Sequence, residues 1–448
     1  MRQLRPGYRG QDGRLVDDPL TAAGEAPSVD LDGLARLFTG PGLWGEFTPS
    51  SFFTGVELVW PPVTPTATNT PLPEVFADAV AELCADASAV AVSLSGGLDS
   101  LAVLTHVLAL RPLRRVLAFV VDLVDDSGMR TATFVRGLLA DLDLTERVQL
   151  VVVDPAHCIT EPAWSPHGPR PDALPVVNAT VARLAAEAGA GVLLSGDGAD
   201  ELLAVPRFAT AQVLQRFGIR GARRYLADMA QSGPAICGEL LAMASHALPV
   251  AARTRLYWAA NWPEWSPPAV SDVLAEPLRE AARAWARDWV DATLRAHATA
   301  RRSWASADAF DAWWPRNYRP PTGFLPEASP FLHPDVVAAA VALPLATRYH
   351  PAGVTAYQRS KAHVIELFPP ALRPGLPDRK RTYRAALAAS VARRSATPIA
   401  ETIGLLDPDA VARETDPATR MTVAAVESWL SGAVTAGITM PCGYGVRR

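Results

Sequence analysis

The sequence predicts an α/β protein, with a doubly wound parallel sheet and a C-terminal helical layer. Four short apolar, β-branched runs after residue 88 lack polar alternation, which is typical of strands buried on both faces of a parallel sheet. Segments with helical periodicity separate these runs, and the alternation of strand and helix indicates right-handed crossovers. After residue 205 no further run of this kind follows, and the remainder is expected to be mainly helical.

The expected elements follow one another along the chain. A helix is expected first, over residues 73–88, where apolar residues recur at three- and four-residue spacing. Ligands of doubly wound sheets bind at the carboxyl ends of the strands, and the first and fourth strand runs both end in Ser-Gly. The strand runs are 88–96, 116–124, 149–154 and 190–196, and the helices between them are expected at 99–110, 129–141 and 177–188.

The bulk composition excludes several classes of protein. Hydrophobic residues make up 49% and charged residues 20%, a globular balance, and the net charge of −4 provides no basic surface for nucleic acid. No apolar run is long enough to span a membrane, and the N-terminus lacks the apolar core of a secretory signal. The four cysteines are scattered, so reduced thiols in a cytoplasmic protein are expected, without structural zinc.

A small, polar break separates the first strand from the helix that follows it, at residues 95–100. Gly96 and Gly97 allow positive φ and a close approach of the backbone to an anion, and the unpaired N–H groups at the helix start favour phosphate. No lysine follows, so this is not the ATPase loop that ends in Gly-Lys-Ser/Thr. Asp99 has two explanations: it holds a Mg²⁺ ion between itself and a phosphate, or it is a first-turn acid that the helix dipole favours.

A second Gly-rich turn, residues 193–203, follows the fourth strand run. It carries Asp197, Asp200 and Glu201. Two acidic Gly turns at neighbouring strand ends form a natural site for a magnesium-bound polyphosphate. The pair of turns therefore favours the magnesium explanation for Asp99.

Lysine occurs at only two positions, Lys361 and Lys380, in a chain with 42 basic residues. The guanidinium group of arginine is planar and extended, whereas the ammonium group of lysine is a compact charge on a flexible side chain. A lysine that persists in such an arginine-rich chain is a candidate for a site that needs a compact ammonium. The alternative is chance survival on the surface.

These motifs resemble those of a known family. The sequence SLSGGLDS, residues 93–100, resembles the PP-loop of the N-type ATP pyrophosphatases. The sequence LLSGDGADELL narrows the resemblance to the synthetase domain of the asparagine synthetases and their relatives, among them β-lactam synthetase and the lasso-peptide macrolactam cyclases. Residues 328–344 resemble the family's Pro-Phe-Leu-Asp segment, with His333 at the Asp position. Both lysines fall on segments that resemble the family's closing motifs, so chance survival is disfavoured.

The resemblance implies a reaction. ATP and Mg²⁺ are the implied cofactors: a carboxylate attacks the α-phosphorus of ATP, pyrophosphate leaves, and an amine converts the acyl-adenylate into an amide and AMP. Asp99 and Asp200 would hold Mg²⁺, Lys380 would place its ammonium on the reacting phosphate, and Lys361 would assist. The phosphates would be held by Ser95, Gly96, Gly97, Leu98, Asp99 and Ser100, and the adenosine pocket would be bordered by Ser93, Ser195 and Gly196.

The amine nucleophile must lose a proton, and the sequence offers two carboxylates near the implied site. β-Lactam synthetase uses a tyrosine–glutamate pair with the tyrosine inside the second Gly turn, where this chain has Asp197, as asparagine synthetases have an acid. A β-lactam-forming activity is therefore disfavoured. Glu327, just before Pro330-Phe331, is a candidate general base, and a surface carboxylate is the alternative.

The resemblance also divides the chain. Residues 1–70 are expected to be a short remnant of a glutaminase-like domain plus a Pro-rich linker, and residues 71–448 the ATP-dependent synthetase domain. No cysteine follows Met1, so ammonia is not expected to come from glutamine.

The most favoured interpretation is a lasso-type macrolactam cyclase, which joins an Asp or Glu side chain of a peptide to the peptide's own α-amine. The sequence DELLAVPRF after the second turn resembles that of lasso cyclases. The alternatives are amidation of a small-molecule carboxylate with ammonia or a separate amine, and an inactive relative that acts as a scaffold. The expected partners are the peptide or small-molecule substrate, with a leader protease and a precursor-recognition protein as further candidates.

Overall fold

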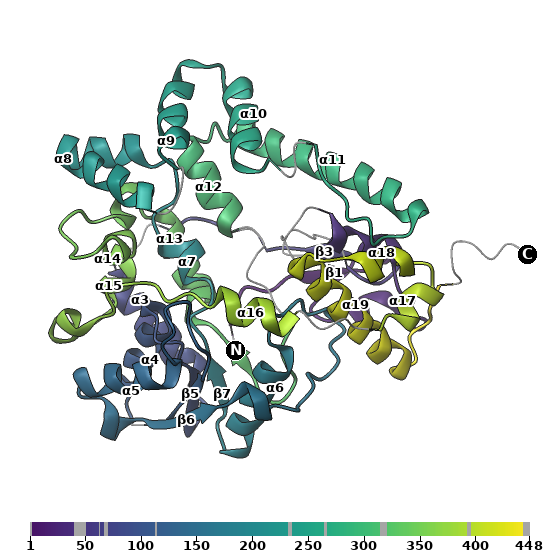
Figure 1. Ribbon diagram of the computed structural model, residues 1–448, viewed down its shortest axis with the longest axis horizontal. Coiled ribbons are helices and arrows are strands. Elements are labelled where there is room, and N and C mark those ends of the chain that lie inside the picture. The colour runs from purple at the N-terminus through teal and green to yellow at the C-terminus, as the bar shows by residue number, and fades with distance from the viewer. Residues whose placement is uncertain are drawn as a thin grey trace, which may run out of the picture.

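The computed structural model contains a five-stranded, wholly parallel sheet, which lies at the lower left in Figure 1. The structure describes residues 2–39, 51–61, 63–66, 70–112, 114–231, 235–263, 267–313, 320–391 and 396–441. The strand order is β6-β5-β4-β7-β8. The strands are β4 (Ala89–Ser93), β5 (Arg115–Val121), β6 (Gln149–Val153), β7 (Val192–Leu194) and β8 (Glu327–Ala328). The predicted α/β class is confirmed.

Strands β4 and β7 are neighbours in the sheet, with Val90 paired to Val192 and Val92 to Leu194. The two Ser-Gly turns therefore leave the same edge of the sheet side by side. The expectation that strands end near residue 205 is wrong, because β8 pairs with β7 through Glu327 and Ala328. A strand of two residues leaves no apolar run in the sequence.

Helices cover both faces of the sheet. The helices α3 (Leu72–Leu83), α4 (Leu98–Ala109) and α5 (Thr131–Asp141) pack on one face, and α6 (Pro175–Glu187) packs on the other. Successive strand residues point to opposite sides, so Val90 and Val92 join the first layer while Ala91 joins the second. The inner positions of β4, β5 and β7 are apolar and buried, which explains why those runs show no alternation, whereas β6 at the edge of the sheet is only partly buried.

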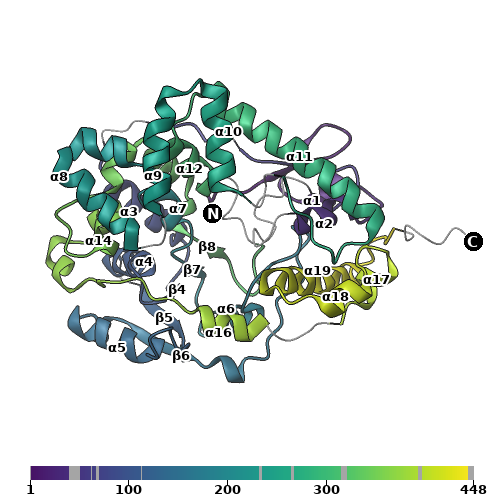
Figure 2. The same cartoon turned by 45° about the horizontal axis from the view of Figure 1, so that its top comes forward.

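A helical region continues from the sheet and arches toward the C-terminal helices (Figure 2). Its tryptophans Trp258, Trp262 and Trp304 are buried together between helices, which is a packing role. The helices of this region are α7 (Ala199–Leu203), α8 (Thr210–Gln231), α9 (Ala235–Ala244), α10 (Val250–Asn261), α11 (Glu276–Thr299) and α12 (Trp304–Trp313). After β8 follow α13 (Pro334–Ala342), α14 (Ala356–Ser360), α15 (Ala362–Glu366) and α16 (Arg384–Val391).

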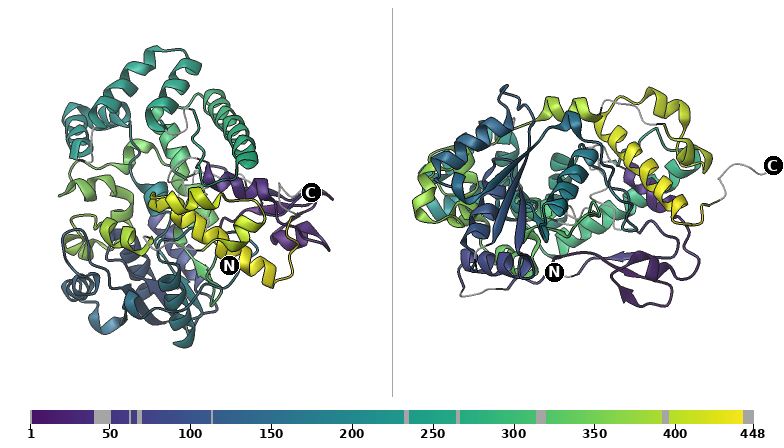
Figure 3. Two further views of the ribbon diagram at one scale, coloured as in Figure 1. Left: turned by 45° about the vertical axis from the view of Figure 1, so that its right-hand side comes forward. Right: turned by 90° about the horizontal axis from the view of Figure 1, so that it is seen from below.

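The two ends of the chain share one hydrophobic core (Figure 3). The strands β1 (Gly7–Arg9), β2 (Leu15–Val16) and β3 (Glu57–Val59) form an antiparallel sheet, accompanied by α1 (Pro19–Ala23) and α2 (Leu31–Ala35). This unit packs on the C-terminal helices, and the ring of Phe53 meets that of Trp429 edge-on at 5.8 Å. The C-terminal helices are α17 (Pro398–Thr402), α18 (Pro408–Arg413) and α19 (Pro417–Thr435).

The division at residue 70 remains a prediction. Residues 62 and 67–69 of the Pro-rich segment, and residues 40–50 of the expected remnant, lie outside the described residues. Within the described ranges, no helix combines the length and the apolar character that a membrane span requires.

Candidate active site

The first Gly turn lies between β4 and α4 and has a backbone that only glycine adopts without strain. Gly96 has φ of +78°, and a Cβ atom there would lie 2.9 Å from the ring of Phe134. Gly97 is the N-cap of α4 and provides no side chain to cap the helix. The N-terminus of this 12-residue helix, with the helix dipole behind it, is a candidate anion site, although its Leu98 N–H already donates to the Tyr357 hydroxyl.

The hydroxyls of the first turn lie beside one another. Ser100 is buried, and its Oγ lies 3.2 Å from the Oγ of Ser95 and accepts a hydrogen bond from the Ser95 N–H. Leu98 is the buried first residue of α4. Ser93 ends β4 just before the turn.

The second Gly turn packs directly against the first. A Cβ atom on Gly196 would lie 2.7 Å from the backbone N of Ser100 and 3.0 Å from the Cβ of Asp99. Ser195 donates a hydrogen bond to Asp197 at 3.0 Å, and the Asp197 carbonyl accepts one from Ser329 at 2.6 Å. The predicted proximity of the two turns is thus present in the structure.

Lys361 joins the two turns. It lies between α14 and α15 and is 2% exposed. Its Nζ lies 2.7 Å from both carboxylate oxygens of Asp99 and 2.5 Å from Oδ1 of Asp200. Carboxylates from two turns that are far apart in the sequence thus converge on one buried cation.

The electrostatics of this cluster keep Lys361 and Asp200 charged. Burial alone would lower the pKa of Lys361, but the charges of Asp99 and Asp200 outweigh it and raise that pKa above its usual value. Burial likewise opposes ionisation of Asp200, yet Lys361 and Lys380 hold the pKa of that carboxyl well below its usual range. Burial raises the pKa of Asp99, against the opposing charge of Lys361.

Lys380 completes the cluster from the outside. Its side chain is 61% exposed, and its Nζ lies 2.8 Å from Oδ2 of Asp200. Both lysines of the chain therefore contact the same carboxylate, one buried and one facing solvent. An exposed ammonium at the mouth of an anion site is free to contact a bound ligand.

The loop that carries Lys380 is anchored by its next residue, which sequence reasoning missed. Arg381 pairs with Asp125 at 2.6 Å, and both side chains are almost fully buried. Its guanidinium also lies 4.2 Å from the centre of the Phe134 ring, the ring that lies against Gly96. Arg381 thus couples the position of the Lys380 loop to that of the first Gly turn.

Tyr357 is a second residue that sequence reasoning missed. Its hydroxyl accepts a hydrogen bond from the Leu98 N–H at 3.3 Å, at the first residue of α4. Burial raises the pKa of Tyr357 to about 12, so the phenol stays protonated. Its position four residues before Lys361 gave no usable signal, because Tyr357 is in α14 whereas Lys361 lies between α14 and α15 with a non-helical backbone.

A buried ion pair anchors α14, which carries Tyr357. Arg359 donates to Asp228 through Nε at 2.7 Å and Nη2 at 2.5 Å, and Tyr349 donates to the same carboxylate at 2.7 Å. Burial would raise the pKa of Asp228, but these hydrogen bonds hold it below its usual value.

Glu327 is directed to a different set of partners. Its Oε1 accepts hydrogen bonds from the backbone N–H of Thr322 at 2.6 Å and from the Thr322 hydroxyl, and its Oε2 lies 3.8 Å from Arg170. Glu327 is on β8, next to the strand that leads into the second turn. Its role as general base stays a prediction.

His333 takes over the helix-capping task that an Asp would perform at its position. It is 2% exposed, is the N-cap of α13, and its Nδ1 accepts from the Asp335 N–H at 3.4 Å. Since Nδ1 accepts, the proton lies on Nε2, which faces Glu82 at 3.2 Å.

A metal ion at this site would need ligands beyond the protein. The described part of the chain contains no group of three or more His, Cys, Asp or Glu side chains that could hold a metal. Asp99 and Asp200 supply two carboxylates. Two carboxylates together with phosphate oxygens and water are the usual ligands of Mg²⁺ in nucleotide sites.

Comparison with known proteins gives one match. The family model described as asparagine synthase matches residues 72–437, a range that contains the sheet, both Gly turns and both lysines. No curated protein matches the chain.

Proposed function

This chain belongs to the asparagine synthase family, and on that premise we propose that it is an AMP-forming ligase that closes a macrolactam ring in a peptide. Membership of the family indicates ATP-dependent ligase activity. The formation of AMP and the peptide substrate are the proposal.

The proposed reaction has two steps. A carboxylate oxygen of the substrate attacks the α-phosphorus of ATP, the bond to the bridging oxygen breaks, and pyrophosphate leaves. The amine then attacks the carbon of the acyl-adenylate and loses a proton, and AMP leaves with the oxygen that the carboxylate contributed. The net products are an amide, AMP and pyrophosphate.

One observation carries the proposal: two carboxylates and both lysines meet where two Gly turns touch. The open N-terminus of α4 would bind the triphosphate, because its N–H groups and helix dipole attract anions. Lys380 would donate to the phosphate oxygens on which charge develops, since its ammonium is exposed and is held toward the site by Asp200. Tyr357 would orient the start of α4 through Leu98.

Asp99 and Asp200 would hold Mg²⁺, which neutralises phosphate charge when bound. The fit is supported by their oxygens, which already converge on one cation, the Lys361 ammonium. Lys361 would keep Asp200 ionised and would hold the two carboxylates facing one another.

The ring-closing form of the reaction is favoured by features around the second turn. Asp197 stands where a β-lactam-forming enzyme has tyrosine. The sequence that follows Asp200 resembles that of lasso cyclases. Glu327 would accept the proton of the attacking amine, from the strand next to the second turn.

The test is to incubate the protein with ATP, Mg²⁺ and a panel of synthetic peptides, each with one Asp or Glu and a free N-terminus. The expected result is AMP, pyrophosphate and a peptide lighter by one water. Peptides with acetylated N-termini are the matched control and should lose no water. AMP formed only with small carboxylic acids and ammonia would replace ring closure by simple amidation, and no AMP with any carboxylate would overturn the proposal.

A further inference from the structure

A cavity of about 620 Å³ lies between the segment 161–176, the end of α16 and one face of α19. This volume is within the usual range for ligand sites. We propose that the cavity binds the amine-terminal segment of the peptide substrate, so that the N-terminal amine reaches Glu327. The inference rests on the proposed function and adds where the amine-bearing part of the substrate is held.

The lining of the cavity reaches the residues that surround Glu327, although Glu327 itself is not a lining residue. Arg170 lines the cavity, and its Nη1 lies 3.8 Å from the Glu327 carboxylate. Pro320 and Pro321 also line it, and the next residue, Thr322, donates to Glu327. Glu327 therefore lies at the boundary between the cavity and the edge of the sheet.

A second connection runs through the segment that carries Lys380. Helix α16 begins a few residues after Lys380, and its last two residues, Ser390 and Val391, line the cavity. Ser390 donates to the carbonyl of Ala173 on the opposite wall at 2.8 Å. In the ribbon, α16 lies beside the end of α19 (Figures 1 and 2). A ligand in the cavity would thus touch elements that lead to both Glu327 and Lys380.

The walls are suited to apolar peptide side chains. The indole N–H groups of Trp164 and Trp429 donate to backbone carbonyls at 3.1 and 2.9 Å, so both rings are fixed. The α19 face offers small residues, and the opposite walls offer prolines. These lining residues are Ala424, Ala425, Ser428 and Gly432, with Pro162 and Pro175.

The charges favour an ammonium at the end near the active site. Arg170 is contacted by two carboxylates, Asp172 at 3.3 Å and Glu327 at 3.8 Å. Elsewhere in the lining, the negative charge of Glu161 and the positive charge of Arg420 cancel in the net charge. The charged lining residues sum to zero, and Glu327, which lies beside Arg170 just outside the lining, adds one negative charge that attracts the positive terminus of a peptide.

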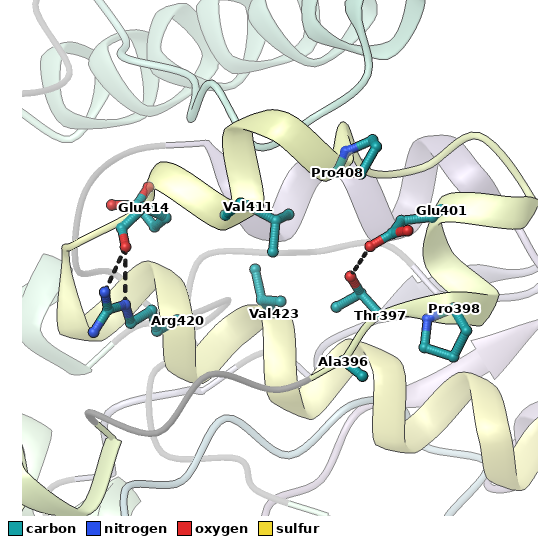
Figure 4. A pocket seen from close by; sticks show the side chains of 10 residues that line it. Ala396, Thr397, Pro398, Glu401, Pro408, Val411, Glu414, Arg420 and Val423 are labelled. Atoms are coloured by element: carbon teal, nitrogen blue, oxygen red, sulfur yellow. Dashed lines mark hydrogen bonds between the residues drawn. The ribbon is translucent and has the colours of Figure 1, made fainter.

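The experiment fills the cavity from α19 with Ala425→Trp or, as a second variant, Ser428→Trp. The matched control is Val411→Trp, which fills a separate cavity of about 370 Å³ between α17, α18 and α19, where Val411 and Val423 face one another (Figure 4). The probe is a pool of free-N-terminus peptides with one Asp or Glu each. The fraction retained by the protein in ultrafiltration is measured by mass spectrometry, next to the same pool with acetylated N-termini.

The wild-type protein and the Val411→Trp control should retain the free-amine pool, and both α19 variants should bind it about tenfold more weakly. ATP binding, followed with a fluorescent analogue, should not change. Equal retention by all variants, equal retention of the acetylated pool, or no retention by the wild type would each overturn the inference. AMP formation by the wild type with the same pool reports separately on the proposed function.

Discussion

Replacing Lys361 with methionine should destabilise the protein through its two carboxylate partners. Lys361 is 2% exposed and contacts three carboxylate oxygens at 2.5–2.7 Å. Removal of one partner from a buried ion pair typically costs about 3–5 kcal/mol. Asp200 is 42% exposed and keeps Lys380, so most of the loss comes from Asp99, whose side chain is 20% exposed. We therefore expect the Lys361→Met variant to lose about 3 kcal/mol of unfolding free energy at pH 8.

The loss of unfolding free energy in the Lys361→Met variant should become smaller as the pH falls. Burial already raises the pKa of Asp99, and the loss of Lys361 raises it further. A carboxyl group whose folded-state pKa lies above its unfolded value stabilises the fold when protonated, and this contribution is lost as the pH rises. The deficit of the variant should therefore shrink by about 1.4 kcal/mol for each pH unit over which Asp99 takes up its proton.

The assay is urea unfolding followed by circular dichroism, at pH 8 and pH 5. Lys380→Met, at the only other lysine, is the matched control and should cost less than about 1 kcal/mol, because its side chain is 61% exposed. The reasoning is refuted if the Lys361 variant is as stable as the Lys380 variant, or if its deficit is the same at both pH values.

Three further predictions concern Lys380, whose catalytic role is proposed, and the two buried anchors Arg381 and Asp228. Lys380→Met should slow pyrophosphate release by about 10²–10³-fold, the loss expected for one preorganised donor; an unchanged rate would remove its catalytic role. Arg381→Ala should lower kcat by up to about 10²-fold, because the loop that carries Lys380 would be misplaced. The Arg381→Lys variant should recover part of this activity, and the KM for ATP should change little. An effect on KM alone would contradict the anchoring role. Asp228→Asn should cost about 3–5 kcal/mol by leaving Arg359 buried without its charge partner. The folded-state pKa of Asp228 is depressed, so the ionised carboxylate stabilises the fold above the unfolded-state pKa, and this stabilisation is lost as the pH falls through the folded-state pKa. The difference in unfolding free energy between the variant and the wild type should therefore narrow in acid. A difference that does not depend on pH would contradict the ion pair.

Much of the sheet could be predicted because its central strands β4 and β5 are apolar runs that are almost fully buried. The runs that became β4, β5 and β6 are apolar at nearly every position, and each precedes a helix with clear periodicity. Strand β8 could not be found, since Glu327–Ala328 forms a strand only by pairing with β7. The N-terminal sheet has strands of two or three residues, and their packing on α19 is a long-range contact that no local pattern encodes.

The candidate site was predictable where the chemistry is local. The glycines and acids of the two Gly turns predict a phosphate site from composition alone, and the rarity of lysine indicates Lys361 and Lys380 as site candidates. The bridge from Lys361 to both carboxylates was not predictable, because it joins residues far apart in the sequence. The Arg381 anchor gave no signal, since one arginine among so many has nothing to distinguish it.

The central claim is that a substrate carboxylate attacks the α-phosphorus of ATP between the two Gly turns. Its most direct test is to supply the accepted peptide with ¹⁸O in its Asp or Glu carboxylate and to analyse the nucleotide product by mass spectrometry. The expected product is AMP that carries one ¹⁸O atom in its phosphate, together with unlabelled pyrophosphate. Label in inorganic phosphate alongside ADP, or AMP without label, would contradict it.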